Sequence, residues 1–430
     1  MSKSCDPNPI RPESPTNISH VVFGLIGSVE GWRHRRPFIE SWWRPNITRG
    51  YLFLDAAPPD DLLPWPSSSP RFRVSEDTSV QILQYTGHDA TMVRIARGIL
   101  ETFREGDEGV RWIVMGDDDS IFFTENLVEV LGRYDHNEYV YIGGHSESLS
   151  SNFVHSFDMG FGGAGVIFSY ALAKALVPWL DECIKRYPSV IAADQMWQSC
   201  LADMGVYLTP HKGIHQIDLH GDISGLLSAH PQTPLLSLHH PEKVNAIFPS
   251  MDRHQSVNHL MKAASVDQSR LLQQTICYHR PSNWSLSISW GYSAHIYDQL
   301  YPKSVLQKPL QTFLPWRRNA RPPLFRFNTR IPSKDPCDAP HVFYFRSVNN
   351  STDTGQILTT YIRPRSRRLP PDCSFNGGHS PAHISEIRVF SPLIKLSPAN
   401  QRECCDLLVS EDKNTAEVKY RACMKDEVIA

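Results

Sequence analysis

Three consecutive aspartates, Asp117, Asp118 and Asp119, interrupt an apolar stretch that reads RWIVMGDDDSIFF. Trp112–Met115 has the composition of a short buried strand, and Gly116 is predicted to allow a tight turn after it. The carboxylates would then gather at the carboxyl end of the strand, where open α/β sheets bind ligands. Crowded carboxylates repel one another unless a cation neutralises them, and hard oxygen donors suit Mg²⁺ or Mn²⁺. The segment therefore predicts a metal site that can also hold a diphosphate, although a lone Asp-x-Asp is more often a solvated acidic turn.

A glycine-rich stretch, FDMGFGGAGVIFS, is the second unusual feature, and Gly162 and Gly163 lie at its centre. Backbone without side chains lets a ligand approach closely, and a flat sugar ring suits aromatic neighbours. The spacing matches neither G-x-G-x-x-G nor the Walker pattern, so phosphate cradling of those kinds is not indicated. Glycines that serve only a tight bend are the alternative.

Two further residues could take part in chemistry. Asp194 opens a predicted helix, DQMWQSCLADMG, where its carboxylate is either an N-cap or a general base presented toward the site. His239 follows the apolar run Leu235–Leu238 within a histidine-rich stretch. A neutral imidazole can complete an aspartate-based metal site. For most of the neighbouring histidines, a place in a loop or in the core is the better expectation.

The segments before the aspartates also offer polar groups. His20–Ile26 is predicted to be a buried parallel strand, and Ser28 in the loop after it is placed to touch a nucleotide. Trp32–Trp43 is predicted to be a helix in which Arg35 and Arg36 can meet phosphate or carboxylate. A simple turn at Ser28 and solvated arginines are the alternatives.

Strands and helices alternate through the first half of the chain, for example in the strand Arg49–Leu54 and the Asp-capped helix Asp89–Phe103. This alternation predicts an α/β domain of the nucleotide-binding kind with a mostly parallel, helix-covered sheet. A helix is expected over Ala264–Ile276, followed by short β-like segments separated by Pro, Asn and Ser. We therefore expect a flexible leader over residues 1–18, an α/β domain over 19–265 and a smaller β-rich C-terminal domain over 266–430.

Composition limits the possible partners. The chain has 430 residues, 41% of them hydrophobic, and its formal net charge is −2. That charge, without a basic cluster among aromatic residues, argues against a nucleic-acid partner. No stretch approaches the roughly 18 apolar residues of a membrane span, and the start lacks the pattern of a signal peptide. Membrane attachment is therefore expected only through an anchor not present in this sequence.

Cysteines and sequons point to an oxidising compartment. Five of the nine cysteines fall in the last hundred residues, and no spacing among them suggests zinc. Disulfides are the favoured interpretation of this C-terminal cluster, with buried thiols as the alternative and connectivity open. The cysteines are Cys5, Cys183, Cys200, Cys277, Cys337, Cys373, Cys404, Cys405 and Cys423. Sequons occur at Asn17, Asn46, Asn283, Asn349 and Asn350 and are consistent with a glycoprotein.

Four blocks, HRRPFIESWW, GDDDSIFF, FGGAGVIFS and ADQMWQSCLADMGV, occur in this order along the chain. Together they resemble the fringe-like and β-1,3-galactosyltransferase superfamily, especially its plant fringe-related branch with a domain of unknown function. The likeness spans roughly Ser19 to Cys277, and the cysteine-rich tail is similar to that branch as well. Glu40 and Ala193 differ from the residues usual in the superfamily.

The resemblance implies a GT-A fold, which is Rossmann-like, and inverting transfer of a hexose or N-acetylhexosamine from a UDP-sugar. The acceptor would be a hydroxyl of a glycan or glycoconjugate, with a β-1,3 linkage expected. Asp119 and His239 would bind Mn²⁺ or Mg²⁺, Asp117 and Asp118 would support the nucleotide and donor sugar, and Asp194 would be the base. The resemblance also implies a type II membrane protein of the Golgi lumen.

Two other classes of function compete with this interpretation. An apolar strand followed by Asp-x-Asp also resembles the nucleophile loop of haloacid-dehalogenase-like, Mg²⁺-dependent phosphatases, in which the first aspartate is phosphorylated. Against it, Ile121 stands where Thr or Val is expected, and the strand lies far from the N-terminus. The third class is a carbohydrate-binding protein without turnover, in which the glycine-aromatic block holds a glycan.

Overall fold

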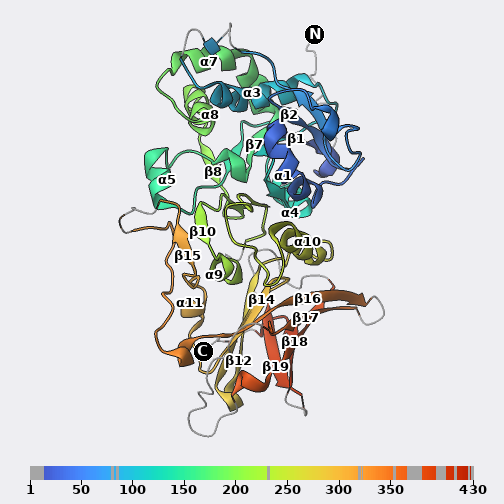
Figure 1. The fold of residues 1–430 in the computed structure, drawn as a ribbon, viewed down its shortest axis with the longest axis vertical. Helices are drawn as coiled ribbons and strands as arrows, with labels where there is room; N and C mark the ends of the chain where they lie inside the picture. The colour runs from blue at the N-terminus through green and yellow to red at the C-terminus, as the bar shows by residue number, and fades with distance from the viewer. Residues whose placement is uncertain are drawn as a thin grey trace, which may run out of the picture.

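The structure is a computed structural model that describes residues 14–78, 82–83, 87–229, 233–317, 321, 323–351, 355–365, 380–393, 403–410, 414–424 and 427. Cys5, Cys373 and most of the expected leader lie outside the described residues. The chain forms an elongated molecule, with the first half at one end and an extended β-structure at the other (Figure 1).

A seven-stranded sheet lies at the centre of the N-terminal half, with strand order β3-β2-β1-β4-β7-β6-β8. All neighbouring strands are parallel except the two pairs that β7 makes with β4 and β6. This confirms the predicted α/β character with a mostly parallel sheet. In sheet order the strands are β3 (Arg71–Val74), β2 (Arg49–Leu54), β1 (Val21–Ile26), β4 (Trp112–Asp117), β7 (Val166–Ser169), β6 (Tyr141–Gly143) and β8 (Leu208–Pro210).

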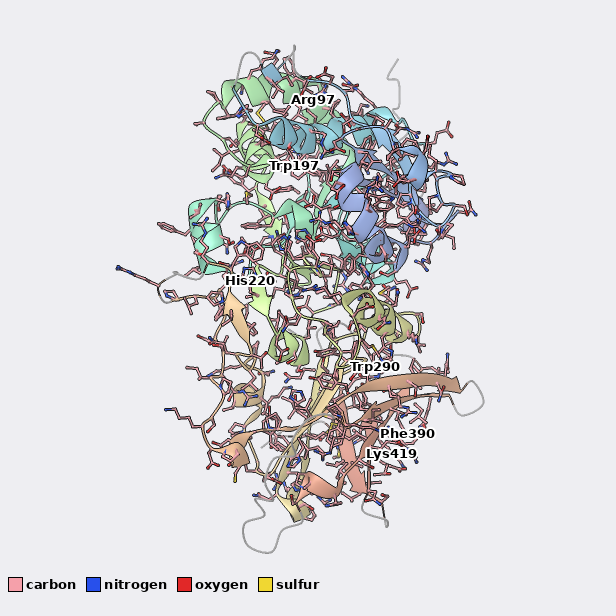
Figure 2. The ribbon with its side chains drawn as sticks, in the orientation of Figure 1. Arg97, Trp197, His220, Trp290, Phe390 and Lys419 are labelled. Carbon is pink, nitrogen blue, oxygen red and sulfur yellow. A yellow bond between two sulfur atoms is a disulfide. The ribbon has the colours of Figure 1, made fainter. Side chains whose placement is uncertain are left out.

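Helices cover both faces of this sheet, which is why its central strands are buried throughout. On β1, the side chains of Val21 and Phe23 pack on the face covered by α1 and α4, whereas Val22 packs on the face covered by α3, α6, α7 and α8. Trp197 and Arg97 mark that second face in Figure 2. The helices are α1 (Val29–Glu40), α3 (Ala90–Arg104), α4 (Thr124–Leu131), α5 (Leu149–Val154), α6 (Tyr170–Leu176), α7 (Leu180–Arg186) and α8 (Ala193–Asp203).

The C-terminal part contains an eight-stranded sheet, antiparallel except between β18 and β20. Its two edge strands, β12 and β19, are joined by the disulfide Cys277–Cys405, so the sheet curls back on itself. In sheet order the strands are β12 (Gln274–His279), β13 (Trp284–Ser289), β14 (Ser293–Tyr297), β16 (His341–Ser351), β17 (Gln356–Ile362), β18 (Glu386–Pro392), β20 (Thr415–Arg421) and β19 (Cys404–Val409).

Short elements connect the two large sheets. β10 precedes the domain boundary that was expected after residue 265, and β15 follows it. The two strands nevertheless pair with each other. One cluster of buried apolar side chains includes both Trp32 of α1 and Tyr361 of β17, so a single apolar core runs through both halves. The connecting elements are β5 (Ile121–Phe122), β9 (Ile214–His215), β10 (Leu219–Gly221), α9 (Ser224–Ser228), β11 (Ser237–Leu238), α10 (Arg253–Ala264), α11 (Lys303–Leu306) and β15 (Phe313–Pro315).

Two local predictions are wrong. Gly116 is not in a turn, because β4 continues through Asp117 and Gly116 lies opposite Leu25 of β1. The helix expected over Ala264–Ile276 is absent, since α10 ends at Ala264 and Gln274 opens β12. The segment reads ASVDQSRLLQQTI, in which most residues are polar and the few apolar ones give no clear helical period.

Disulfides occur in both halves. Cys404–Cys423 lies in the C-terminal part, where the sequence predicted such bonds, and Cys337 is also disulfide-bonded. Cys183–Cys200 joins α7 to α8 within the N-terminal half. Among the described residues, no helix combines the length and the apolar character needed to cross a membrane.

Candidate active site

The aspartates follow directly from the end of β4. Asp117 is level with Ile26, the last residue of β1, so both strands end at one edge of the sheet. The Asp118 N–H donates to the Ile26 carbonyl at 3.0 Å. Ser120 fixes the turn, because its Oγ accepts from the Asp117 N–H at 2.7 Å and donates to the carbonyl of Gly163 at 2.6 Å. The acidic turn is therefore tied to the glycine-rich segment.

A short strand pairing brings a histidine to this turn. In β11, Leu238 lies opposite Ile121 of β5, so His239 emerges beside the aspartates. His239 Nε2 lies 3.0 Å from Asp119 Oδ1 and 3.5 Å from Asp117 Oδ2. One ligand atom from each of these three residues lies within 4.8 Å of the others. The sequence-predicted pair Asp119 and His239 thus meets, and Asp117 joins it.

The charges of this group are strongly coupled. Burial alone would raise the pKa of Asp119, but His239 and Arg35 hold it well below its usual range. Burial would lower the pKa of His239, yet the two aspartates raise it to about 9. Burial raises the pKa of Asp117 to about 6. Adjacent carboxylates in a site with little water thus need a positive partner to stay ionised.

Asp118 faces the other way, toward α1. Its Oδ1 accepts from Arg35 Nη1 at 2.7 Å, and burial raises its pKa to about 7 against the effect of that arginine. Gly27 and Gly31 leave room for it, since a Cβ on either would lie within 2.9 Å of Asp118 Oδ2. Arg35 also donates to both carboxylate oxygens of Glu242, at 2.6 and 3.1 Å. Arg35 therefore links Asp118 to the loop that carries His239.

Asp194 lies against the glycine-rich segment. It is the second residue of α8, whose N-cap is Ala192, so Asp194 is not the N-cap. A Cβ on Gly162 would lie 2.4 Å from Asp194 Oδ1, and a Cβ on Gly163 would lie 2.1 Å from His239 Cε1. The two glycines thus give room to a carboxylate and an imidazole of the chain itself. Burial raises the pKa of Asp194 to about 6, against the hydrogen bond from the Gly162 backbone.

Asp117, Asp194 and His239 line one cavity of about 370 Å³. Asp117 is open to it, with 33% of its side chain exposed, while Asp119 is 1% exposed. Trp197, which donates to the Ala96 carbonyl at 2.8 Å, fixes α8 against α3 beside the cavity. The lining residues include Asp117, Gly162, Gly163, Ile191, Asp194, Trp197, Gln216, His239 and His240.

Two predicted contact residues lie apart from this group. Ser28 is the N-cap of α1, and its hydroxyl accepts from the Gly31 N–H at 3.0 Å. Arg36 donates to Glu40 Oε1 at 3.0 Å, one helical turn further along α1. Neither lines the cavity that contains Asp117 and Asp194.

Several site residues were missed by the sequence analysis. Glu242 accepts a hydrogen bond from Arg35, and Gln216 accepts one from the Ala164 N–H at 2.9 Å. Trp316 stacks on His240 with ring centroids 4.9 Å apart. The sequence SLHHPEK placed Glu242 close to His239, so that residue could have been found. Trp316 gave no signal, because it lies 76 positions beyond His240 and reaches it only through the pairing of β15 with β10.

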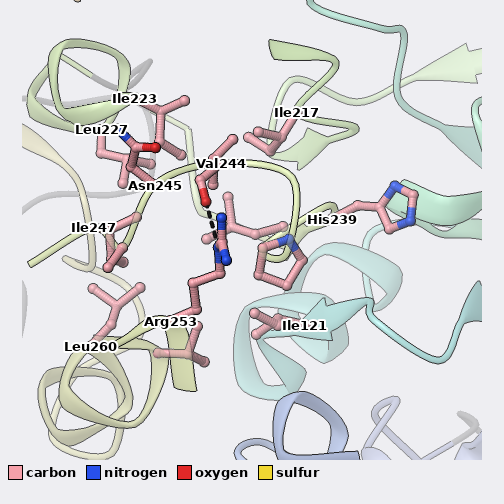
Figure 3. Close-up of a pocket in the computed structure, with 14 residues that line it drawn as sticks. Ile121, Ile217, Ile223, Leu227, His239, Val244, Asn245, Ile247, Arg253 and Leu260 are labelled. Atoms are coloured by element: carbon pink, nitrogen blue, oxygen red, sulfur yellow. Dashed lines mark hydrogen bonds between the residues drawn. The ribbon is translucent and has the colours of Figure 1, made fainter. Parts of the chain in front are cut away.

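A second, smaller cavity supports the His239 loop from behind. It measures about 30 Å³, is almost wholly apolar, and is lined by Ile121, Ile217, Val244 and Leu260 among others. Figure 3 shows the His239 ring directed away from this apolar lining. Arg253 donates to the Val244 carbonyl at 2.7 Å, shown as the dashed line in Figure 3. We interpret this cavity as packing that holds the loop in place.

No curated protein matches this chain. Among solved structures, the apo form of mouse xyloside xylosyltransferase 1 aligns with 48% of this chain and 85% of that chain, at 10% identity and a TM-score of 0.27. At that TM-score the two folds share too little for an activity to be carried over. One family model begins within α5, after the aspartate turn, and covers the glycine-rich segment, Asp194 and His239. The chain belongs to the family described as "Protein of unknown function, DUF604", whose model matches its residues 151–405.

Proposed function

We propose that this protein is an inverting, metal-dependent glycosyltransferase with a GT-A type fold. It would move a hexose or N-acetylhexosamine from a UDP-sugar to a hydroxyl of a glycan or glycoconjugate. One observation carries the proposal: Asp117, Asp119 and His239 place three ligand atoms within 4.8 Å of one another, and Asp117 and His239 line a cavity that Asp194 also lines.

The donor set of this group fits a hard divalent cation. Two carboxylate oxygens and one imidazole nitrogen suit Mn²⁺ or Mg²⁺ better than a soft metal, which would favour thiolates. Asp119 and His239 are buried and face each other, and Asp117 opens to the cavity. Such a cation, when bound, acts as a Lewis acid that offsets the charge of a leaving diphosphate.

Asp194 is the base in this proposal. An inverting displacement needs a carboxylate that takes the proton of the acceptor hydroxyl as that oxygen attacks the donor sugar from the face opposite the leaving group. A pKa raised to about 6 keeps Asp194 ionised at neutral pH and makes it a stronger base than an ordinary aspartate. Its position at the start of α8, next to the Gly162 backbone, fixes its direction.

The other polar residues would serve the donor. Asp117 faces the cavity and would support the nucleotide and the donor sugar, beside the Gly162–Gly163 backbone. Asp118 would act indirectly, because it orients Arg35 rather than lining the cavity. We also propose that Ser28 and Arg36 contact the nucleotide. The linkage formed would be β-1,3, and the protein would be anchored to the membrane in the Golgi lumen.

Calorimetric titration with UDP tests the proposal. We expect UDP to bind when Mn²⁺ is present and to be released by excess chelator, after which a screen of UDP-sugars for hydrolysis would identify the donor. Absence of UDP binding in either condition would contradict the proposal. Mg²⁺-dependent release of phosphate from an aryl phosphate would support a phosphatase instead, and glycan binding indifferent to UDP would support a carbohydrate-binding protein.

A further inference from the structure

The orientation of His239 has an unusual basis. Its Nε2 faces Asp119 and Asp117, but its Nδ1 is buried and has no hydrogen-bond partner within the described part of the chain. Histidines that bind metals almost always donate their second ring N–H to an acceptor, which fixes the ring. Besides the contact of Nε2 with Asp119, the direction of the His239 ring therefore depends on packing.

A column of stacked rings supplies that packing. The ring centroids of His239 and His240 lie 3.8 Å apart, with an interplanar angle of 29°. His240 stacks on Trp316 at 4.9 Å and 10°, and Trp316 stacks on His220 at 4.5 Å and 11°. The backbone of Gly163 closes the Cε1 edge of the His239 ring. Each ring thus limits the rotation of the next.

The column reaches the site from the C-terminal part of the chain. In the antiparallel pair of β10 and β15, His220 lies opposite Leu314, and Trp316 follows the end of β15. Figure 2 shows His220 between the two halves of the molecule. Because β10 holds His220 and β15 leads to Trp316, this small ribbon sets the distance between the two rings.

We infer that Trp316 is a positioning residue for the metal ligand His239 and acts through the ring of His240. This inference rests on the proposed function, in which Asp119 and His239 hold Mn²⁺ or Mg²⁺. Without the indole, the His240 ring loses the surface it stacks on, and the stacked face of the His239 ring loses its support. The C-terminal part of the chain would then control metal affinity without supplying a ligand.

The test is Mn²⁺ binding by the full chain without nucleotide, with free Mn²⁺ measured by electron paramagnetic resonance. We expect Trp316→Ala to weaken Mn²⁺ binding by about 10- to 100-fold, the range seen for outer-sphere partners of metal ligands. Trp316→Phe should restore most of the affinity, because a phenyl ring can still stack. Leu314→Ala, two residues before Trp316 and with 63% of the residue exposed, is the matched control and should bind like the wild type.

The outcomes separate this inference from the proposed function. Wild-type Mn²⁺ affinity in a folded Trp316→Ala variant would overturn the inference and leave the proposed function intact. A wild-type chain that binds no Mn²⁺ would overturn both, and unchanged affinity in Asp119→Ala would overturn the proposed ligand set. If Trp316→Ala does not fold, His220→Ala decides, since loss of the outermost ring should also weaken Mn²⁺ binding, whereas an unchanged affinity would contradict the inference.

Discussion

His239 Nε2 lies 3.0 Å from Asp119 Oδ1, although the two residues are 120 positions apart in the chain. The pairing of β11 with β5 produces this contact, because it places Leu238 opposite Ile121. Two two-residue strands therefore create the group on which the proposed activity depends.

Asp119→Ala should abolish metal-dependent UDP binding. The change removes one of the two buried ligands, so we expect the Mn²⁺ affinity to fall by more than the roughly 10- to 100-fold typical of outer-sphere partners. Titration calorimetry with UDP and Mn²⁺ measures the affinity of the variant for both. Asp135→Ala, an exposed carboxylate, is the control. Equal UDP affinity in the Asp119 variant and the wild type would rule out this residue as a ligand.

Asp194→Asn should separate binding from turnover. The amide keeps the shape of the carboxylate but cannot accept a proton, so we expect transfer to fall by roughly 10²- to 10⁴-fold. UDP affinity in the presence of Mn²⁺ should stay within about twofold. Asp203→Asn, at the other end of α8, is the matched control and should keep full turnover. Unchanged turnover in Asp194→Asn would remove this residue as the base.

Alanine substitutions at Gly162 and Gly163, the two glycines beside the cavity, should impair different properties of the protein. In Gly163→Ala the new Cβ meets the His239 ring, so metal binding should be lost first. In Gly162→Ala it meets the Asp194 carboxylate, so turnover should fall while Mn²⁺ binding persists. Gly132→Ala is the control, because a Cβ there would have no neighbour closer than 3.4 Å. Mn²⁺ titration and turnover assays on all three variants check this. The same loss profile at both positions would show that the substitutions act through general unfolding.

The disulfides should contribute unequally to stability. Cys277–Cys405 closes a loop with a sequence separation of 128 and Cys183–Cys200 one of 17. Chain-entropy arguments give about 4.7 kcal/mol for a loop near the longer length and about 3 kcal/mol for one near the shorter. The double variant Cys277→Ala, Cys405→Ala should therefore lose more free energy of unfolding than Cys183→Ala, Cys200→Ala. Denaturant unfolding measures both, and a larger loss in the second variant would contradict the expectation.

The sequence was sufficient for the parts of this protein that depend on local pattern. The all-apolar run of β1 and the spaced apolar residues of α3 predicted a helix-covered, mostly parallel sheet, and that sheet is present. The strand before the aspartates was also predicted, because the apolar run Trp112–Met115 is typical of a buried strand, and β4 contains it. Local chemistry likewise singled out Asp119, Asp194 and His239, which the fold brings to one cavity and its walls.

Tertiary structure decided everything that depends on distant residues. The pairing of β15 with β10, which carries Trp316 to His240, has no local signature, since such short strands gain their stability from the surrounding core. Arg35 donates hydrogen bonds to Asp118 and Glu242, which lie 83 and 207 positions further along the chain. Sequence pattern reports the period of one element at a time, whereas these contacts form only when burial of the shared apolar core fixes all the elements together.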